Sequence, residues 1–322
     1  MENSQISLLT PSDVRELANR LGIRPTKTLG QNFVTDAGSV RKIVREAGVE
    51  PGDYVLEVGP GLGSLTLALL EAGAHVSAVE IDAALAAALP HTLAQHGVPD
   101  GAFAVTLMDA MQLQGPASLA RPALADAVGE SGNLQETGVG QVGNISGPSK
   151  LVANLPYNVA VPIILTVLER FPSIRSALVM VQLEVADRLA ARPGSKTYGV
   201  PSAKAAWYAE VSRGSKISRN VFWPVPNVDS ALVAFTRREG EGLEALPGFD
   251  GLADREAVFG VVDAAFAQRR KTLRAALAGW AGSAARAEEI IRAAGIDPSL
   301  RGEKLGIEDF ARIVAASTAP GN

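Results

Sequence analysis

Hydrophobic and polar positions alternate with two different periods between residues 53 and 109. Short, almost wholly apolar runs at 53–59, 75–81 and 103–109 are separated by stretches at 64–73 and 82–97, in which apolar residues recur every three to four positions. The short runs are typical of buried strands, and the longer stretches are typical of helices that cover a sheet. This alternation predicts a βαβαβ unit with parallel strands.

The strand and helix pattern continues beyond residue 150 and then changes. Runs at 150–156 and 176–185 predict two more strands around a helix at 161–170, and segments 207–218 and 230–238 predict a closing antiparallel pair. We therefore expect an α/β fold with a seven-stranded, mostly parallel sheet in a first domain at 1–242, which includes an N-terminal segment at 1–50. Helical periodicity over 255–316 predicts a small all-α second domain at 243–322. The Gly- and Ser-rich segment 112–149 predicts a flexible insertion.

Composition and charge narrow the class of protein. The chain has 322 residues, of which 47% are hydrophobic, and its net charge is −4. The absence of cysteine excludes disulfides and thiolate metal sites, and the three histidines have no ligand spacing, so we expect no bound metal. The sequence shows no leader pattern and no apolar run of membrane-spanning length. We expect a soluble, cytoplasmic monomer without a membrane partner.

Three glycines mark the junction between the first expected strand and its helix: Gly59, Gly61 and Gly63. At such a junction, backbone N–H groups can approach a ligand closely. A dinucleotide-binding turn places its third glycine or alanine at position 64, where this chain has Ser64, and this disfavours pyrophosphate binding. The spacing from Glu57 through the three glycines resembles the first motif of the S-adenosylmethionine-dependent methyltransferases. The resemblance implies that S-adenosylmethionine is the cofactor.

Three acidic residues lie at the ends of successive expected strands: Glu57, Glu80 and Asp109. The carboxyl ends of parallel strands meet at one edge of a sheet, where ligands bind in α/β proteins. At that edge, Glu80 would accept hydrogen bonds from two ribose hydroxyls, and Asp109 would accept from the amino group of the cofactor adenine. Each acid taken singly is also compatible with a helix N-cap.

The apolar run from residue 150 ends in Asn154, Leu155, Pro156 and Tyr157. The adenine N6 lone pair is delocalised into the ring, so its methylation depends on geometry. If the Asn154 side-chain oxygen and the Leu155 carbonyl both accept from the amino group, the lone pair points at the methyl donor. Pro156 would fix the carbonyl direction, and Tyr157 would stack on the base. Taken alone, the tetrapeptide is equally typical of a turn that ends a strand.

Basic residues gather in several short clusters, of which Arg269, Arg270 and Lys271 with Arg274 form the densest. A single cluster of this kind is more typical of a solvated helix face than of a binding site. Several clusters together are compatible with a polyanionic partner such as a nucleic acid, even at a net charge of −4.

Together these motifs resemble the ribosomal RNA adenine dimethyltransferase family, and in particular its small-subunit branch. The similarity spans Thr26 to about Ile313, and segments 29–36, 181–189, 195–199, 222–233, 265–277 and 300–313 match blocks of the family. It implies that Gln31, Asn32 and Phe33 contact the methionine part of the cofactor. It also implies that Asn154 contributes to cofactor binding and that Phe222 forms the other face of an aromatic clamp on the target base.

The family resemblance implies a class I methyltransferase fold and the dimethylation of two adjacent adenines near the 3′ end of small-subunit (16S) rRNA, coupled to subunit maturation. The helical domain would hold the RNA. Two alternatives share much of this pattern: a large-subunit rRNA adenine methylase of the macrolide-resistance type, and a noncatalytic RNA-binding assembly factor. Leu155, in place of the isoleucine common in the first, and the presence of Asn154 and Tyr157 disfavour them. A nicotinamide dehydrogenase is disfavoured by Ser64.

Overall fold

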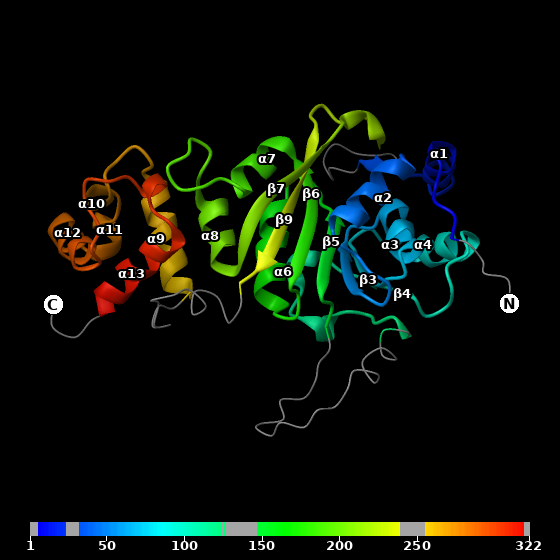
Figure 1. Cartoon of the computed structure of the whole chain (residues 1–322), viewed down its shortest axis with the longest axis horizontal. Helices are drawn as coiled ribbons and strands as arrows, with labels where there is room; N and C mark the ends of the chain where they lie inside the picture. Colours follow the sequence, from blue (N-terminus) through cyan, green and yellow to red (C-terminus); the bar gives the residue numbers. More distant parts are fainter. Residues whose placement is uncertain (1–5, 24–31, 124, 126–146, 239–254, 319–322) are drawn as a thin grey trace, which may run out of the picture. The chain divides into compact units, whose positions relative to one another are not determined.

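The computed structural model describes residues 6–23, 32–123, 125, 147–238 and 255–318 (Figure 1). The chain divides into two compact units: residues 1–186 with 213–235, and residues 187–212 with 236–322. The second unit therefore includes a segment, 187–212, that precedes the boundary expected at residue 242. Compactness alone does not show which segments fold independently, so the expected boundary remains a prediction.

A seven-stranded sheet has the strand order β4-β3-β2-β5-β6-β9-β7. The five strands from β4 to β6 pair in parallel along this order. Their bounds, with those of β7 and β9, are β2 (Tyr54–Val58), β3 (His75–Glu80), β4 (Phe103–Leu107), β5 (Lys150–Asn154), β6 (Ser176–Gln182), β7 (Ala209–Ile217) and β9 (Ser230–Arg237). The predicted βαβαβ unit and the predicted seven-stranded sheet are both confirmed.

The helices expected between these strands form where the apolar periodicity placed them. They are α3 (Ser64–Glu71), α4 (Ala83–Gln95) and α6 (Ala160–Arg170), and α3 and α4 both pack against β3. Two further helices, α1 (Pro11–Arg20) and α2 (Ala37–Glu46), had not been predicted. Each begins at a side-chain cap, Thr10 for α1 and Asp36 for α2, whose oxygen accepts a hydrogen bond from a first-turn N–H. Capped N-termini and amphipathic faces were the sequence signals for both helices.

A small two-stranded sheet joins two segments that are far apart in the sequence. Strand β1 (Phe33–Val34) pairs antiparallel with β8 (Phe222–Trp223), so that Phe33 faces Trp223 and Val34 faces Phe222. The N–H of Thr35 extends the pairing by donating to the Val221 carbonyl at 2.8 Å. The described part of the family-like segment 29–36 is thereby held against segment 222–233. Strands of two residues carry no detectable period, so the sequence could not predict this sheet.

The second unit is built on helices and on a cluster of aromatic side chains. Its helices are α8 (Val200–Tyr208), α9 (Arg255–Ala267), α10 (Leu273–Ala276), α11 (Ala278–Ala281), α12 (Ala284–Ala293) and α13 (Ile307–Thr318), and α7 (Leu183–Leu189) reaches into it. The predicted helical C-terminal segment is confirmed. Among the described helices, none is long and apolar enough to cross a membrane.

The expected strand at 207–218 begins two residues too early. Trp207 and Tyr208 end helix α8, and β7 begins at Ala209. Both rings meet Phe259 of α9 edge-on, with centroids 6.0 and 6.2 Å away, and both side chains are buried. Packing against α9 therefore outweighs the strand preference of two neighbouring aromatic residues.

Part of the predicted insertion at 112–149 is described. Residues Ala110–Gln112 and Pro116–Ser118 form two short 3₁₀ helices, η2 and η3. Residues 124, 126–146 and 239–254 lie outside the described residues. The flexibility of the insertion therefore remains a prediction.

Gly63 offers a direct test of the turn that starts α3. Its φ of +97° is a conformation that other residues rarely adopt, and a Cβ there would lie 2.7 Å from Leu89 Cδ1. We expect Gly63→Ala to lower the free energy of unfolding by about 1–3 kcal/mol, as measured by denaturant titration. Gly38→Ala is the matched control, because Gly38 is exposed in the first turn of α2 and has an ordinary φ. Equal stability of the two variants would contradict this account of the turn.

Candidate active site

A cavity of about 240 Å³ opens at the carboxyl ends of β2, β3 and β5. Eleven of the residues predicted from the sequence line it: Asn32, Phe33, Glu57, Gly59, Gly61, Glu80, Asp109, Asn154, Leu155, Pro156 and Tyr157. The three acids at successive strand ends are therefore brought together at one edge of the sheet, as expected. We refer to this space as the first cavity.

Two of the predicted site residues that the structure describes, Gly63 and Phe222, do not line the first cavity. Gly63 starts α3 with its positive φ. Phe222 is only 2% exposed and belongs to the hydrophobic core, because the β1–β8 pairing turns its side chain inward beside Val34. In this structure its ring is not presented to a base in the cavity. Gln31 lies outside the described residues.

The glycine turn brings the backbone close to the neighbouring segments. Gly59 and Gly61 have φ values of +70° and +59°. A Cβ at Gly61 would lie 3.0 Å from the ring of Phe33, and a Cβ at Gly59 would lie 3.8 Å from the Asn154 carbonyl oxygen. The left-handed backbone therefore favours glycine at both positions, and the close approach of the Phe33 ring is a second reason at Gly61.

Glu80 is a buried carboxylate at the end of β3 that holds the glycine turn in place. One oxygen accepts from the Gly61 N–H at 3.1 Å, and the other accepts from the N–H groups of Ile81 and Asp82 at 2.9 and 3.0 Å. Burial raises the pKa of Glu80, while these three hydrogen bonds act in the opposite direction. A carboxylate has about four lone-pair sites. About one site is left for a ligand hydroxyl, where two such bonds had been expected.

Glu57 lies within β2 and is 1% exposed. Burial is the main cause that raises its pKa to about 8; the nearby Thr66 hydroxyl acts in the opposite direction, and the charge of Glu80 adds to the increase. Its Oε2 atom has no hydrogen-bond partner among the described residues, and neither has the buried hydroxyl of Ser64, which also lines the cavity. Buried polar atoms of this kind are almost always satisfied in proteins. Both atoms are thus available to a polar ligand.

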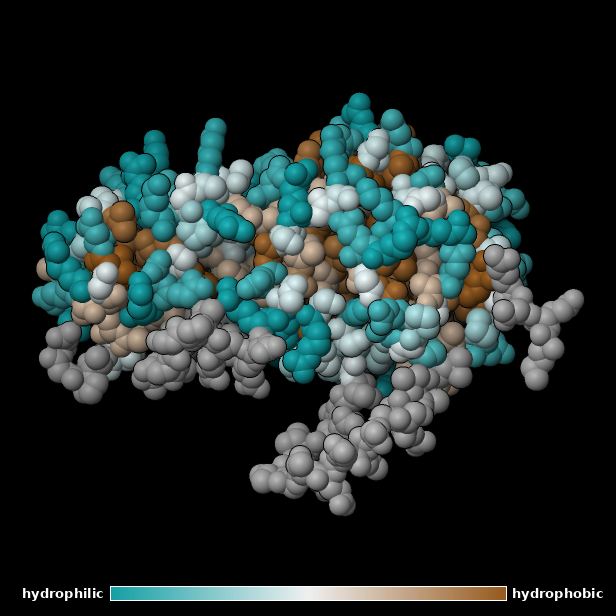
Figure 2. All heavy atoms as spheres, viewed as in Figure 1, coloured by the Kyte–Doolittle hydropathy of each residue, from teal (hydrophilic) through white to brown (hydrophobic). Residues whose placement is uncertain are grey.

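Two apolar side chains at the rim of the cavity had not been predicted. Ile81 follows Glu80 and is 61% exposed, and Met111 follows Asp109 by two residues and is 42% exposed. Hydrophilic and hydrophobic side chains are mixed over the visible surface (Figure 2). Two exposed apolar side chains that line one cavity offer contacts for an apolar part of a ligand. Asp109 caps η2 by accepting from the Met111 N–H at 2.9 Å. Isolated apolar residues beside acids at strand ends were the available sequence signal.

The orientation of the Asn154 side-chain amide is fixed by a backbone carbonyl. Its Nδ2 atom donates to the Asn32 carbonyl oxygen at 3.2 Å. A carbonyl oxygen can only accept a hydrogen bond, so the nitrogen must face it, and the Oδ1 atom of Asn154 must point the other way. This contact joins the end of β5 to the segment before β1, both of which line the first cavity.

Tyr157 is held by a hydrogen bond to β9. Its hydroxyl lies 2.7 Å from the hydroxyl of Ser230, which is fully buried. Burial raises the pKa of Tyr157, so the phenol stays protonated at neutral pH. The sequence did not single out Ser230. The bond fixes the ring of Tyr157 in the cavity wall, as a stacking surface requires.

The residues of the first cavity fit a nucleoside that carries an amino-acid tail. Ile81 and Met111 offer apolar contacts for a base, Glu80 retains an acceptor for a ribose hydroxyl, and Glu57 and Ser64 offer unpaired polar atoms. A glycine turn and strand-end acids on a mostly parallel seven-stranded sheet define a class I S-adenosylmethionine-dependent methyltransferase.

Comparison with solved structures agrees with this class. A dimethyladenosine transferase from Plasmodium falciparum matches with a TM-score of 0.65 at 20% identity, over 88% of this chain and 96% of that one. The 23S rRNA methyltransferase ErmE matches with a TM-score of 0.58 at 24% identity, over 89% of this chain and 100% of that one. At such identities the likeness shows the fold.

The chain belongs to the ribosomal RNA adenine dimethylase family, whose model matches residues 23–318. It is 60% identical over 309 residues to the ribosomal RNA small subunit methyltransferase A of Kineococcus radiotolerans, covering 96% of this chain and 91% of the relative. It is 58% identical over 312 residues to the protein of the same name from Thermobifida fusca, covering 97% of each. It is thus an enzyme that methylates rRNA adenines with S-adenosylmethionine.

The buried carboxyl of Glu57 makes the stability of the cofactor-free protein depend on pH. Its pKa is about 8 in the folded state and near 4.5 when unfolded, so between these values only the folded state holds the proton. Stability is then lost as the pH rises through this window, by roughly 1 kcal/mol per pH unit. Glu57→Gln has no proton to lose at this position, so we expect its free energy of unfolding to fall less than that of the wild type between pH 5 and pH 8. Urea titrations at each pH measure the difference. Parallel pH profiles of the two proteins would refute the assignment.

Proposed function

We propose that the chain transfers methyl groups from S-adenosylmethionine to N6 of two adjacent adenines near the 3′ end of small-subunit rRNA. The products are N6,N6-dimethyladenines, and the reaction is coupled to small-subunit maturation, with the protein acting as a monomer. The observation that carries the proposal is the fixed Asn154 amide at the edge of the first cavity. The names of the two relatives, both small-subunit methyltransferases, support the small subunit as the substrate.

Asn154 and Leu155 would hold the adenine amino group. With Nδ2 engaged by Asn32, the Oδ1 atom is left to accept one N6–H. The Leu155 N–H donates to the Met180 carbonyl at 3.1 Å. No described residue donates to the Leu155 carbonyl. That carbonyl would accept the second N6–H. Two acceptors on one side of the nitrogen draw its hydrogens out of the base plane and turn its lone pair toward the opposite side.

Catalysis in this arrangement is positioning and not proton abstraction. When bound, the cofactor would supply an electrophilic methyl group on a positively charged sulfur. As the N6–C bond forms, the S–C bond breaks, the sulfur leaves as a neutral thioether, and the surplus N6 proton passes to solvent. Neither an amide oxygen nor a backbone carbonyl is a base at neutral pH. Asn154 and Leu155 therefore orient the nucleophile, Pro156 restricts the direction of the Leu155 carbonyl, and the ring of Tyr157 covers one face of the base. Phe222 would complete the clamp only if the β1–β8 region repacks, because its ring is buried.

The cofactor would lie along the carboxyl ends of β2 and β3. Gly59 and Gly61 allow the backbone to approach it, and Glu80 would accept from its ribose. Asp109 would accept from the amino group of its adenine, with Ile81 and Met111 on the base faces. We assign the methionine part to Asn32, Phe33 and Glu57, which line the same cavity, and to Gln31 from the family resemblance alone.

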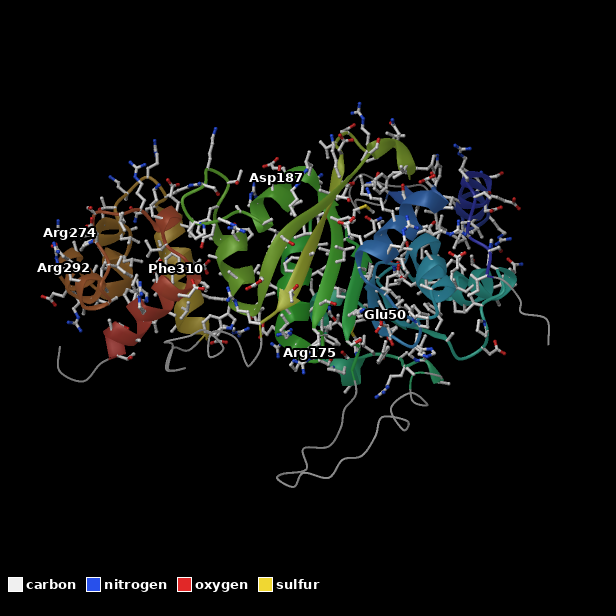
Figure 3. All side chains as sticks on the ribbon, in the orientation of Figure 1. Glu50, Arg175, Asp187, Arg274, Arg292 and Phe310 are labelled. Carbon is white, nitrogen blue, oxygen red and sulfur yellow. The ribbon has the colours of Figure 1, made fainter. Side chains whose placement is uncertain are left out.

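The basic cluster of the second unit divides into two parts. Arg269 donates to Glu303 at 3.0 Å and also to the Lys196 carbonyl, and Arg274 lies 2.8 Å from Glu288. Figure 3 shows Arg274 close to Arg292, which also pairs with Glu288. Arg270 and Lys271 are exposed and form no ion pair within the described residues. We therefore assign backbone contacts with RNA to Arg270 and Lys271 in place of the whole cluster.

Transfer of a labelled methyl group distinguishes the proposal from its alternatives. The protein is incubated with labelled S-adenosylmethionine and either immature small subunits or large subunits, and the modified adenines are mapped. Label at two adjacent adenines near the 3′ end of the small-subunit RNA is the expected result. Label confined to the large subunit would favour the macrolide-resistance type. RNA binding without transfer would favour the assembly-factor alternative.

Asn154→Ala should separate catalysis from cofactor binding. It removes the acceptor that orients N6, so we expect kcat to fall by about 10² to 10³. The loss of one hydrogen bond to Asn32 should change the Kd of S-adenosylmethionine by less than about tenfold. Single-turnover transfer and equilibrium titration measure the two effects. Asn220→Ala, an exposed amide outside the cavity, is the control. Equal losses in both measurements would show that Asn154 mainly supports the cofactor.

The ring and the hydroxyl of Tyr157 can be tested separately. Tyr157→Ala removes a stacking surface worth about 1–3 kcal/mol, so we expect kcat/KM for the RNA to fall by roughly 5- to 150-fold. Tyr157→Phe keeps the ring and loses only the bond to Ser230, as does Ser230→Ala. Both should stay within about fivefold of the wild type. A defect of Tyr157→Phe as large as that of Tyr157→Ala would assign the function to the hydroxyl.

A further inference from the structure

The family-like segment Ser195–Gly199 takes no part in the first cavity. It lies in the second unit, beside a separate cavity of about 440 Å³. This second cavity is lined by residues 189–193, by one side of α8, by the start of β7 and by residues 306–308. Its volume is far larger than a single buried water requires and falls within the range of small-ligand sites.

Tyr198 places an unused hydroxyl at the second cavity. Its side chain is 2% exposed and lines the cavity, and its Oη atom has no hydrogen-bond partner among the described residues. The ring packs against Phe266 with the centroids 5.9 Å apart. Burial, with the nearby charges of Glu308 and Asp309, raises the pKa of Tyr198, so the group remains an O–H donor. A buried donor left without an acceptor is costly, and a ligand acceptor would relieve that cost.

Arg238 and Glu308 supply a second donor and an acceptor at the same cavity. Arg238 Nε donates to the Ala206 carbonyl at 3.0 Å, and its Nη2 atom lies 3.6 Å from Glu308 Oε1. The two side chains are 18% and 45% exposed, so both remain open to a ligand. The opposite charges offset each other, which disfavours a phosphate. A neutral group with both donors and acceptors fits this set of side chains.

The loop that carries Tyr198 is held in a fixed position. Arg269 donates through Nε to Glu303 at 3.0 Å and through Nη2 to the Lys196 carbonyl at 2.6 Å. The Gly194 N–H donates to the Glu303 carbonyl, also at 2.6 Å. Arg269 therefore ties the loop to the segment before α13. A preformed cavity of this kind binds its ligand with little loss of conformational entropy.

We propose that the second cavity takes an unstacked nucleobase of the RNA substrate, with guanine preferred. Guanine presents two adjacent donors, N1–H and N2–H, that match the two oxygens of the Glu308 carboxylate. Its O6 acceptor would receive the Tyr198 hydroxyl and Arg238. Cytosine and adenine offer a carboxylate only one exocyclic amine, and uracil places two acceptors beside its single donor. Single-stranded RNA is commonly read in this way, by edge contacts to splayed bases.

Direct nucleotide binding tests the cavity without any methyl transfer. The enzyme is saturated with S-adenosylhomocysteine to block the first cavity, and the Arg238 Nε–H resonance is followed by NMR during titration with GMP, AMP, CMP and UMP. We expect GMP to bind most tightly. Tyr198→Phe should weaken GMP binding about fivefold, since one hydrogen bond is lost. Glu308→Gln, which removes the paired acceptor, should weaken GMP binding and reduce the preference for guanine.

Tyr208→Phe is the matched control for the loss of a buried hydroxyl. Tyr208 is 6% exposed in the same unit, but its hydroxyl accepts from Arg255 at 2.9 Å and does not line the cavity. This variant should bind GMP as the wild type does. Thermal unfolding of all variants verifies that they are folded. No response to GMP, equal GMP affinity of wild type and Tyr198→Phe, or tighter binding of another nucleotide would each overturn the inference.

Kinetics with the small subunit as substrate test whether the base in the second cavity belongs to the RNA substrate. The inference rests on the proposed function, because that function supplies the RNA. We expect Tyr198→Phe to raise the KM for small subunits about fivefold, with kcat and cofactor affinity unchanged, whereas Tyr208→Phe leaves all three unchanged. An unchanged KM would refute an RNA base as the occupant. If the wild type transferred no methyl group to rRNA, the proposed function would fail, and the GMP titration would still report on the cavity.

Discussion

The proposed chemistry depends on one hydrogen bond, the donation from Asn154 Nδ2 to the Asn32 carbonyl. An asparagine amide can turn over and exchange its donor for its acceptor at little cost when nothing holds it. A backbone carbonyl removes this freedom, because it tolerates only the nitrogen. The same bond ties the end of β5 to the segment that leads into β1, and β1 is in turn held by β8. The acceptor side of Asn154 is therefore set by backbone geometry and not by a rotamer preference.

The first cavity places two buried carboxyl groups where a positively charged cofactor is expected. Glu57 and Glu80 are both buried, and burial raises the pKa of each. Backbone N–H groups offset the cost of burying an ionised carboxylate only at Glu80. The ionised form of Glu57 is therefore the one that a nearby cation would stabilise most. A binding site that is strained in the absence of its ligand gains affinity from the relief of that strain. The polar atoms left unpaired in the cavity are consistent with such a site.

The sequence predicted the sheet and the edge at which the site lies, because burial imposes regular periods on strands and helices. It also predicted most of the cavity-lining residues, since strand ends and glycine turns leave local signals. It did not predict the β1–β8 pairing, the Ser230 anchor of Tyr157 or the ion pair between Arg269 and Glu303. Each of these joins residues far apart in the chain over one or two positions, which is too short to leave a period in the sequence. The buried position of Phe222 follows from the same unpredicted pairing.

Dimethylation places a further demand on the amide held by Asn32. An adenine that already carries one N6-methyl has a single N–H, so only one of the two acceptors can be used in the second transfer. Asn154 cannot turn to offer its nitrogen, because that nitrogen faces a carbonyl. The remaining N6–H can then donate either to Asn154 Oδ1 or to the Leu155 carbonyl. The first methyl group must occupy the position of the other hydrogen. A methyl beside an unpaired carbonyl desolvates that carbonyl. Asn154 is half-buried and Leu155 is 1% exposed, so the side-chain oxygen of Asn154 is the acceptor that loses less when it faces the methyl. The backbone carbonyl of Leu155, held by Pro156, is the acceptor that both transfers would share.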